Sequence, residues 1–320
     1  MKVLHITNNF PTKKLPIFGI FVKEQIDSLN DIGVESDVLF INGYEKGKGA
    51  YLFGIFRLFC KILFKRYDVI HCHHALSGLV YYYTPKIRHI PCVISFQNDP
   101  INEFGTKVYN KLKRKFDAFI FKNDSPFIKE LEKGYYLPNG VNASFFCPDD
   151  KGICRKKLGL SIDKRYIMFV SSFVIRKQKR EDRFDEVMAI LQNRYPECNY
   201  APLKLVNIPR NQIPFYFNAA NAYLMTSEFE GSPNAVKESL CCNTPVITTN
   251  VGNVVDMLGD IDGCFVCDPY DANTMAEAVH RICSSKYAFN GRDIFLQKGY
   301  GMNEVAHKIE SIYKSILKYS

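Results

Sequence analysis

Short apolar runs alternate with amphipathic segments over the first 123 residues. The apolar runs are rich in Val, Ile, Leu and Phe and lie at 2–7, 35–41, 68–74, 91–96 and 117–123. Their length and composition predict buried strands. Between them, apolar residues recur at helical spacing at 20–33, 51–66, 76–84 and 106–116. Strands that are apolar on both faces predict a parallel sheet covered by helices on both sides.

A segment rich in Pro, Asn, Gly and Asp, residues 138–163, interrupts this alternation and marks a domain junction. The alternation then resumes. We expect strands at 165–173, 245–249 and 263–268, helices at 181–195, 232–243, 271–285 and 301–320, and a helix leading into a strand at 214–227. The pattern predicts two doubly wound, Rossmann-like α/β domains, 1–150 and 151–302, that face each other across a cleft. A C-terminal helix, 303–320, would pack back on the first domain.

Composition narrows the class of protein. The chain has 42 Lys and Arg against 33 Asp and Glu, a net charge of +9 that is spread over both halves. Such a surface favours anionic partners. The odd number of cysteines, 11, at irregular spacings is typical of free thiols in a reducing cytosol. We therefore expect a cytoplasmic protein.

Two local patterns allow more than one interpretation. Cys264 and Cys267 in "CFVC" could be a redox or half-zinc motif, but no second ligand pair has metal-like spacing, so we expect strand residues. In the segment 51–66, Arg57, Lys61 and Lys65 recur every fourth residue among apolar ones. This is typical of a helix in a membrane interface and also of a helix packed on a sheet with one wet edge. The strand that follows at once favours the packed helix.

The most informative stretch is "SEFEGSPNAVKESLCCNTPVITTNVGNV", residues 227–254. Glu230 follows a predicted strand, and Glu238 lies two turns into the helix that "GSPN" opens. The unpaired N–H groups and the dipole of such a helix can hold an anion or sugar hydroxyls, and Glu238 could accept from two ribose hydroxyls. Alternatively, Glu230 favours the helix dipole and Glu238 is a solvated helix residue. The residues alone leave both interpretations open.

These strings resemble the retaining glycosyltransferases of family four, which have the two-domain GT-B fold. That family carries a Glu, seven residues and a second Glu, as in "EGSPNAVKES" here. "CCNTPVITTNVG" and "YYLPNGVNASFFCPDD" are also similar to family elements. The form "EGSPNAVKE" resembles enzymes of surface-polysaccharide assembly.

The resemblance implies roles for the residues of this block. Glu230 would contact the donor sugar as a catalytic residue, and Glu238 would bind the ribose. Backbone amides of the turn would contact the sugar and the diphosphate. The turn comprises Gly231, Ser232, Pro233, Asn234 and Ala235. Pro233 has no N–H and donates nothing.

A second implied cluster is "FVSSFVIRKQKR". The family has an Arg after this strand and a Lys five residues on, both of which neutralise the leaving diphosphate. Lys177 matches the Lys, Ser172 occupies the Arg position, and Arg176 would compensate from the loop. The alternative is a solvated basic turn.

Gly19, after the first strand, would let the backbone approach the donor phosphate or the acceptor, or would simply form a turn.

The family often carries a histidine where this chain has Gln97. A glutamine can hydrogen-bond a donor hydroxyl but cannot act as a general base. His73, with His71 and His74, is a candidate to take part instead, unless the strand buries these side chains for structural reasons. A zinc site at His73 and His74 lacks further ligands.

The resemblance implies a metal-independent, retaining, hexosyltransferase-like enzyme. We expect no metal and no cofactor, since the nucleotide-sugar donor is a substrate, and we interpret "DID", residues 260–262, as a solvated turn. The acceptor would be a glycan or a lipid-linked sugar in capsule, lipopolysaccharide or exopolysaccharide synthesis. Peripheral contact with the inner face of the plasma membrane would follow. No stretch of 18 apolar residues predicts a membrane-spanning helix.

Alternative functions remain. The substitutions at Ser172 and Gln97 fit a non-catalytic GT-B subunit that binds sugar nucleotide, and the fold also suits a sugar-nucleotide epimerase. Nucleic-acid binding is disfavoured because basic and aromatic residues do not interleave in a recognition motif. The segment 195–215 lacks the glycine-rich turn and second strand that line the family's nucleobase pocket, so the sequence does not predict the nucleobase.

Overall fold

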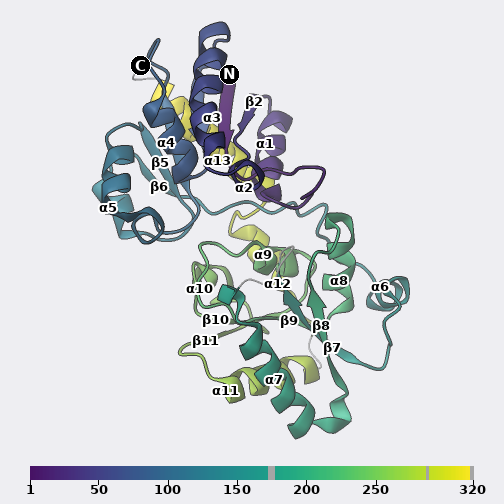
Figure 1. Ribbon diagram of the computed structural model, residues 1–320. Helices are drawn as coiled ribbons and strands as arrows, with labels where there is room; N and C mark the ends of the chain where they lie inside the picture. The colour runs from purple at the N-terminus through teal and green to yellow at the C-terminus, as the bar shows by residue number, and fades with distance from the viewer. Residues whose placement is uncertain (172–176, 286–287, 318–320) are drawn as a thin grey trace. The chain divides into compact units, whose positions relative to one another are not determined.

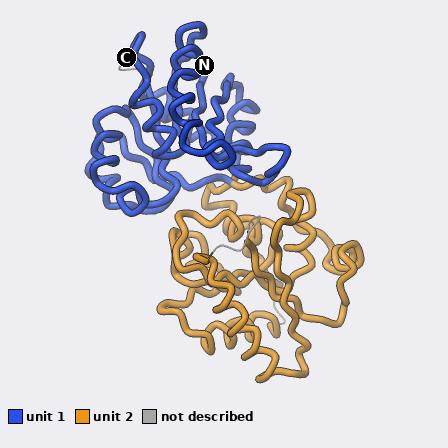
Figure 2. Tube along the Cα trace, viewed as in Figure 1, with its two compact units in different colours: residues 1–140, 302–320 blue, residues 141–301 orange. Residues whose placement is uncertain are grey.

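The computed structural model describes residues 1–171, 177–285 and 288–317 of the chain. Two compact units are present, unit 1 (1–140 and 302–320) and unit 2 (141–301), as Figure 2 shows. The first junction falls ten residues before the expected boundary, 150/151. The turn-rich segment belongs to unit 2, where Val141 forms a bridge with Gly301. Its proline, asparagine and glycine residues signalled the junction but not its position within the segment.

Unit 1 is built on a six-stranded sheet with the order β2-β1-β3-β4-β5-β6, and all its paired strands are parallel (Figure 1). The strands are β1 (Lys2–Thr7), β2 (Glu35–Phe40), β3 (Val69–Cys72), β4 (Cys92–Phe96), β5 (Ala118–Phe121) and β6 (Gly134–Tyr136). Every residue of β3, β4 and β5 is buried, as their continuous apolar runs predict.

Helices cover both faces of this sheet. They are α1 (Ile20–Asp31), α2 (Gly43–Lys46), α3 (Gly49–Phe64), α4 (Ala75–Tyr83), α5 (Pro100–Lys113) and α13 (Met302–Leu317), with the 3₁₀ helix η1 (Pro126–Glu130). One core joins the sheet to α3, α4 and α5. The other joins the opposite face to α1 and α13. The C-terminal helix therefore packs on the first unit, because its buried residues Val305, Ile309 and Ile312 complete that core.

Unit 2 contains a five-stranded parallel sheet with the order β11-β10-β9-β7-β8. The strands are β7 (Arg165–Val170), β8 (Tyr200–Leu205), β9 (Ala222–Met225), β10 (Val246–Thr249) and β11 (Phe265–Cys267). One face packs against α8, α9, α10 and α12, and the other packs against α7 and α11. Both sheets are thus doubly covered, which confirms the predicted α/β class.

The helices of unit 2 are α6 (Lys151–Leu158), α7 (Glu181–Arg194), α8 (Ile213–Ala219), α9 (Asn234–Cys241), α10 (Val254–Leu258), α11 (Ala272–Ser284) and α12 (Gly291–Gln297). Three 3₁₀ helices accompany them, η2 (Lys177–Lys179), η3 (Pro196–Cys198) and η4 (Arg210–Gln212). Local chemistry sets several of the ends. Asp150 and Asp271 cap α6 and α11 by accepting from backbone N–H groups in the first turn, and Gly159 closes α6 in the left-handed conformation.

Two strands were not predicted. β8 lies at the sheet edge and pairs only with β7, and its residues Pro202 and Lys204 are exposed. An edge strand tolerates a proline and charged residues, so it lacks the continuous apolar pattern of the inner strands. β6 has only three residues, none of them buried. No described helix is long and apolar enough to cross a bilayer.

All eleven cysteines are free thiols, as their irregular spacing predicts. Cys267 lies in β11 and is buried, and Cys264 directly precedes that strand. Burial raises the pKa of the Cys264 thiol to about 12, which suppresses the thiolate that redox chemistry needs. The pair is therefore part of the packing of unit 2.

Candidate functional site

Four loops of unit 2 meet at the carboxyl ends of its parallel strands. The loop after β7 holds η2, the loop after β8 leads to Arg210, the loop after β9 holds Glu230, and the loop after β10 holds Gly252. In open α/β sheets, ligands bind at this edge. The candidate site is therefore assembled from segments that lie up to 80 residues apart in the sequence, around the start of α9.

Glu230 forms an ion pair within this edge. Lys179 Nζ lies 2.6 Å from Glu230 Oε1, and the hydroxyl of Ser227 donates to the same oxygen at 2.9 Å. Only 14% of the Glu230 side chain and 16% of the Lys179 side chain are exposed. An ion pair in such partly buried surroundings is stronger than one on the open surface. Both contacts use Oε1, and a carboxylate has two oxygens with several lone pairs, so Glu230 can accept further hydrogen bonds.

Hydrogen bonds fasten the loop of Glu230 to its neighbours. Thr226 Oγ1 donates to the carbonyl oxygens of Lys179 at 3.1 Å and Arg180 at 2.9 Å. The N–H of Glu228 donates to the carbonyl of Gln178 at 2.8 Å. These bonds hold the loops after β7 and β9 in register. Because the backbone of Lys179 is itself bonded to this loop, the ammonium group is directed toward Glu230.

A glycine makes the loop after β10 fit against the loop of Glu230. Gly252 has φ of 59°, and a Cβ at this position would lie 2.3 Å from the carbonyl oxygen of Gly231. No other residue fits without moving the backbone of the turn. Thr249 Oγ1, at the end of β10, donates to the carbonyl of Ser227 at 2.6 Å. The "TTNVG" sequence thus supports the position of the Glu230 loop.

Glu238 lies in the second turn of α9 and is 6% exposed. Its Oε1 accepts from Arg210 Nη1 at 2.6 Å. The guanidinium also lies over the ring of Phe146, 4.7 Å from the centroid. A carboxylate alone would be costly to bury in this place, and the guanidinium of Arg210 offsets that cost.

The turn that opens α9 presents backbone groups. Pro233 is the N-cap of α9 and no side chain caps the helix, so the N–H groups of the first turn are available to a ligand. Ser232 Oγ is buried and has no hydrogen-bond partner among the described residues. Lys237, fully buried, donates to the carbonyl of Ser232 at 3.4 Å and to Asn234 Oδ1 at 3.3 Å. Lys237 therefore braces the turn from behind.

The electrostatics of this edge are balanced in pairs. Glu230 and Glu238 each have one cation within 2.6 Å. Burial, with the charges of Glu230 and then Glu238, raises the pKa of Tyr223 well above its usual value, so its phenol stays neutral under the site. The edge thus combines two carboxylates, two cations and a helix N-terminus. These groups can accept from sugar hydroxyls and hold a diphosphate at the same time.

The lysine beside Glu230 is Lys179, which the sequence analysis did not select. Lys177, the match by spacing, is exposed in η2, and Lys179 makes the contact. Ser172 and Arg176 lie outside the described residues. The sequence "RKQKR" offers several cations within five residues, and spacing cannot select among them without the conformation of the loop. Arg210, in η4, was also missed, because the preceding strand β8 was not predicted and the loop after it was therefore not placed at the edge of the sheet.

Gly19, a predicted site residue, has a structural reason for being glycine. It precedes α1 with φ of 65°, and a Cβ would lie 2.2 Å from the carbonyl carbon of Asn9.

Gln97 follows β4 at the carboxyl edge of the unit 1 sheet. Its Nε2 donates to the carbonyl of His73 at 3.3 Å, and its Oε1 accepts from Asn139 at 3.4 Å. Gln97 is thus held by the ends of neighbouring strands.

Three histidines form a buried stack on one face of the unit 1 sheet. His5, His71 and His73 are at most 1% exposed. His5 Nδ1 and His73 Nε2 lie 2.9 Å apart and share a hydrogen bond. His71 bonds to Tyr313 of α13 at 2.6 Å and to Ser95 at 2.8 Å.

The stack has the properties of packing rather than of a metal centre. One ring nitrogen from each histidine lies within 4.8 Å of the others. However, the rings of His71 and His73 stack at 4.1 Å with 25° between their planes. Metal-binding lone pairs lie in the ring plane, so stacked rings do not direct them to one ion. Burial lowers the pKa of His5 to about 3 and lowers those of His71 and His73 well below their usual value. All three are therefore neutral.

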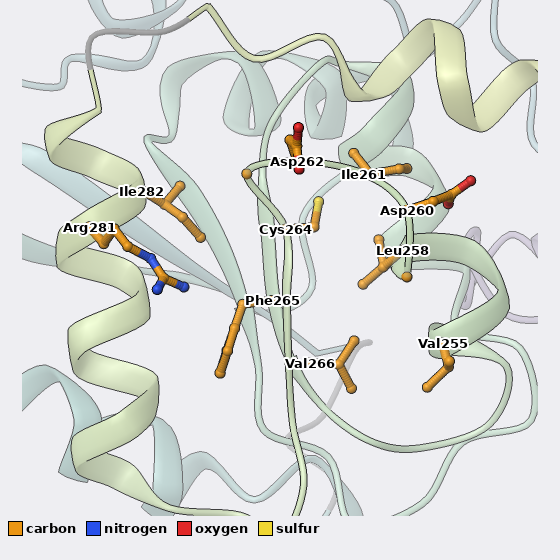
Figure 3. A pocket seen from close by; sticks show the side chains of 12 residues that line it. Val255, Leu258, Asp260, Ile261, Asp262, Cys264, Phe265, Val266, Arg281 and Ile282 are labelled. Carbon is orange, nitrogen blue, oxygen red and sulfur yellow. The ribbon is translucent and has the colours of Figure 1, made fainter.

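A cavity of about 470 Å³ lies elsewhere in unit 2 (Figure 3). Asp260 and Asp262, the predicted solvated turn, lie on its rim with Arg281 and Phe265. Asp260, Asp262 and Phe265 lie in or before β11, at the opposite end of the strands from Glu230, and Arg281 lies in α11. Asp260 pairs with Lys298 and is largely exposed. The cavity is thus separate from the candidate site.

The chain is similar to known glycosyltransferases. Residues 204–300 match the family model "Glycosyl transferases group 1". A Bacillus subtilis protein, assigned as a teichuronic acid biosynthesis glycosyltransferase, is 25% identical over 349 residues, covering 88% of this chain and 89% of the relative. The UDP-Gal:alpha-D-GlcNAc-diphosphoundecaprenol alpha-1,3-galactosyltransferase of Escherichia coli is 24% identical, covering 69% of this chain and 68% of the relative.

The fold is shared with a solved structure. Sucrose-phosphate synthase from Thermosynechococcus elongatus superposes with a TM-score of 0.79 at 15% identity, covering 100% of both chains. The matched family segment, 204–300, contains Arg210, Glu230 and Glu238. With two doubly covered parallel sheets, the chain has the GT-B fold of glycosyltransferases, and its segment 204–300 is similar to the glycosyl transferases of group 1.

Proposed function

We propose that the chain is a retaining glycosyltransferase that moves a hexose from a nucleotide-sugar donor to a lipid-linked or growing glycan acceptor during surface-polysaccharide synthesis. The observation that carries this proposal is the pair of ionised, partly buried contacts Lys179–Glu230 and Arg210–Glu238 beside the uncapped start of α9. The names of the Bacillus subtilis and Escherichia coli relatives support a polysaccharide product, a UDP-sugar donor and a diphospholipid-linked acceptor.

The donor would occupy the carboxyl edge of unit 2. Glu238 would accept from the ribose hydroxyls, and Arg210 would hold that carboxylate in place. The N–H groups at the start of α9 would hold the diphosphate, as helix N-termini commonly do. Glu230 would accept from hydroxyls of the donor sugar. Gln97, at the carboxyl edge of the unit 1 sheet, would offer an amide to the acceptor.

The reaction would proceed by front-face displacement. The bond from the anomeric carbon to the diphosphate oxygen breaks, the sugar develops oxocarbenium character, and the acceptor hydroxyl attacks from the same face. The leaving phosphate takes the acceptor proton, so no protein nucleophile is needed. Lys179, beside the sugar-contacting carboxylate, would offset the charge that the departing diphosphate gains. Fixed cations and backbone amides would thereby supply the charge stabilisation without a metal.

The site of action would be the cytoplasmic face of the plasma membrane. The supporting observation is that the name of the Escherichia coli relative gives a diphosphoundecaprenol-linked sugar as its acceptor. The enzyme would then collect a water-soluble donor and an acceptor that stays in the bilayer.

The test is a product assay with a matched carboxylate control. The purified chain is incubated with a panel of sugar nucleotides and a diphospholipid-linked sugar, with and without a metal chelator, and the product's anomeric configuration is determined by NMR. Glu230→Gln should lower kcat by about 10²–10³-fold, as loss of one preorganised group does. Glu228→Gln removes an exposed carboxylate two residues away and should leave kcat within about twofold.

Each contrary outcome identifies an alternative. An isomerised donor without acceptor would indicate an epimerase. Donor binding without turnover would indicate a non-catalytic subunit. An inverted product would refute the retaining mechanism, and loss of activity with the chelator would refute metal independence. Equal activity of Glu230→Gln and Glu228→Gln would refute the assigned role of Glu230.

A further inference from the structure

Helix α3 of unit 1 buries only a narrow stripe of its surface. The buried residues are Gly54, Leu58 and Ile62, spaced four apart along a 16-residue helix. Gly54 lets the helix approach the sheet closely, because a Cβ there would lie 3.3 Å from Ile41. Only two large apolar side chains, Leu58 and Ile62, lie in this stripe, so most of the large apolar side chains of α3 lie outside it.

Tyr51, Ile55 and Phe59 are half-buried, but five other apolar side chains of α3 lie in solvent. They are Leu52, Phe53, Phe56, Leu63 and Phe64, exposed by 74%, 60%, 61%, 47% and 81%. With an advance of about 100° per residue, this set centres on the side of the helix opposite the buried stripe. Phe53 and Phe56 stack with a centroid distance of 6.2 Å, so the exposed face is continuous. Soluble surfaces rarely expose such a cluster without a partner.

Basic residues border this apolar face. The segment 46–66 contains six, Lys46, Lys48, Arg57, Lys61, Lys65 and Arg66, and no Asp or Glu. Arg57 is fixed by a bond to the carbonyl of Phe40, and Lys61 and Lys65 contact Asp37. Lys46, Lys48 and Arg66 are exposed. The apolar face is therefore flanked by cations with flexible, solvated head groups.

We propose that this face of α3 docks on an anionic lipid bilayer, with Phe53, Phe56 and Phe64 entering the boundary between headgroups and acyl chains. A helix with an aromatic face and basic borders is the form that lies in the plane of a membrane interface. Lys46 and Lys48 would contact lipid phosphates. This assignment deepens the proposed function by naming the surface that would bring the enzyme to a lipid-linked acceptor.

The charge pattern selects a bilayer over a second copy of the chain. Lys61 and Lys65 already pair with Asp37. A symmetric contact through this face would bring the exposed Lys46, Lys48 and Arg66 of two copies together, and the segment 46–66 contains no carboxylate to offset them. Like charges placed opposite each other oppose association. An anionic membrane instead provides negative charge next to an apolar phase, which matches both parts of the surface. Helix α3 packs on the sheet through Leu58 and Ile62, as expected, and the proposal adds an interfacial role for its exposed face.

The experiment measures binding of the full chain to vesicles. Vesicles of phosphatidylcholine with phosphatidylglycerol are compared with vesicles of phosphatidylcholine alone. The triple variant Phe53→Gln, Phe56→Gln, Phe64→Gln should lose at least about tenfold in binding to the anionic vesicles, since each exposed aromatic contributes buried apolar area. Lys46→Gln with Lys48→Gln should lose about fivefold per charge, and added salt should weaken binding of the wild type.

The control is a triple variant of exposed apolar residues on unit 2. Ile153, Ile162 and Val255 are exposed by 63%, 72% and 50%, and their replacement by Gln should leave vesicle binding within about twofold. Equal losses in both triple variants, or equal binding of both lipid compositions by the wild type, would overturn the proposal. The proposal would also be overturned if the wild type were a dimer, the α3 triple variant were a monomer, and neither protein bound vesicles.

A second measurement separates this proposal from the proposed reaction. Transfer to a short, water-soluble acceptor analogue should persist in the α3 triple variant, because α3 contributes no residue to the site in unit 2. Vesicle binding without any transfer by the wild type would leave the docking surface standing and refute the function. Transfer by the wild type without vesicle binding would refute the docking surface alone.

Discussion

Acidification should destabilise unit 1 through its buried histidine stack. In the folded chain, burial holds the pKa of His5 near 3 and holds those of His71 and His73 well below the usual value. The unfolded chain releases these imidazoles to water, where their pKa is about 6.5. Below that pH the unfolded state binds more protons than the folded state. The stability due to the stack is therefore complete above pH 6.5 and is lost as the pH falls.

The magnitude follows from proton linkage. Between pH 7.5 and 5.5, a histidine that stays neutral when folded favours the unfolded state by about 1.4 kcal/mol. The three members of the stack together should remove about 4 kcal/mol of the free energy of unfolding, a large fraction of a typical domain stability. Carboxylates also titrate, so the informative quantity is the difference between the wild type and a variant that lacks one histidine.

The perturbation is His5→Gln. It removes the bond to His73 and should destabilise the chain at neutral pH, but the further loss between pH 7.5 and 5.5 should be about 1.4 kcal/mol smaller than in the wild type. The assay is urea unfolding at each pH, followed by hydrogen exchange in peptides from β1 and β3, which report unit 1 separately. His89→Gln removes an exposed imidazole and serves as the control. An identical pH-dependent loss in His5→Gln and the wild type would refute the reasoning.

Three further predictions concern the site in unit 2. Lys179→Ala should lower kcat by about 10²–10³-fold, while Lys177→Ala, in the exposed position, should have a smaller effect; steady-state kinetics that ranked them in reverse would contradict the assignment from geometry. Arg210→Ala should raise the KM for the donor by about tenfold or more, because an unpaired buried Glu238 is costly, and isothermal titration with the nucleoside diphosphate would show unchanged affinity if Arg210 were irrelevant. Gly252→Ala should lower the thermal midpoint and kcat together, since the backbone has φ of 59° and a Cβ would lie 2.3 Å from the carbonyl oxygen of Gly231; a midpoint equal to that of the wild type would show that the loop can move.

The fold was predictable where burial is uniform. β3, β4, β5, β9 and β10 are buried at every residue, and such runs are apolar enough to be recognised locally. β8 was missed because an edge strand pairs with a neighbour on one side only and so tolerates polar residues. Pro202 and Lys204 interrupt the apolar run by which a buried strand is recognised. Strands with a continuous apolar run were located, including the edge strands β2 and β11, and β8 and the three-residue β6, which lack such a run, were missed.

The site was predictable in part for a related reason. Glu230 and Glu238 share one short segment, so their spacing was visible in the sequence. Their partners Lys179 and Arg210 come from other loops, 51 and 28 residues away. Which lysine of "RKQKR" reaches Glu230 depends on η2 and on the bonds of Thr226 to that loop. No local pattern records such a contact.

The packing of α13 on unit 1 affects the order in which the chain can fold during synthesis. Unit 2 is an insertion between Gly140 and Met302, and Tyr313 with its neighbours closes the face of the first sheet. A ribosome releases the chain from its amino end, so the first sheet must wait with one apolar face uncovered until the whole insertion has emerged. During that interval the nascent chain depends on chaperones or on rapid folding of unit 2. The apolar face of the first sheet is covered when α13 packs on it.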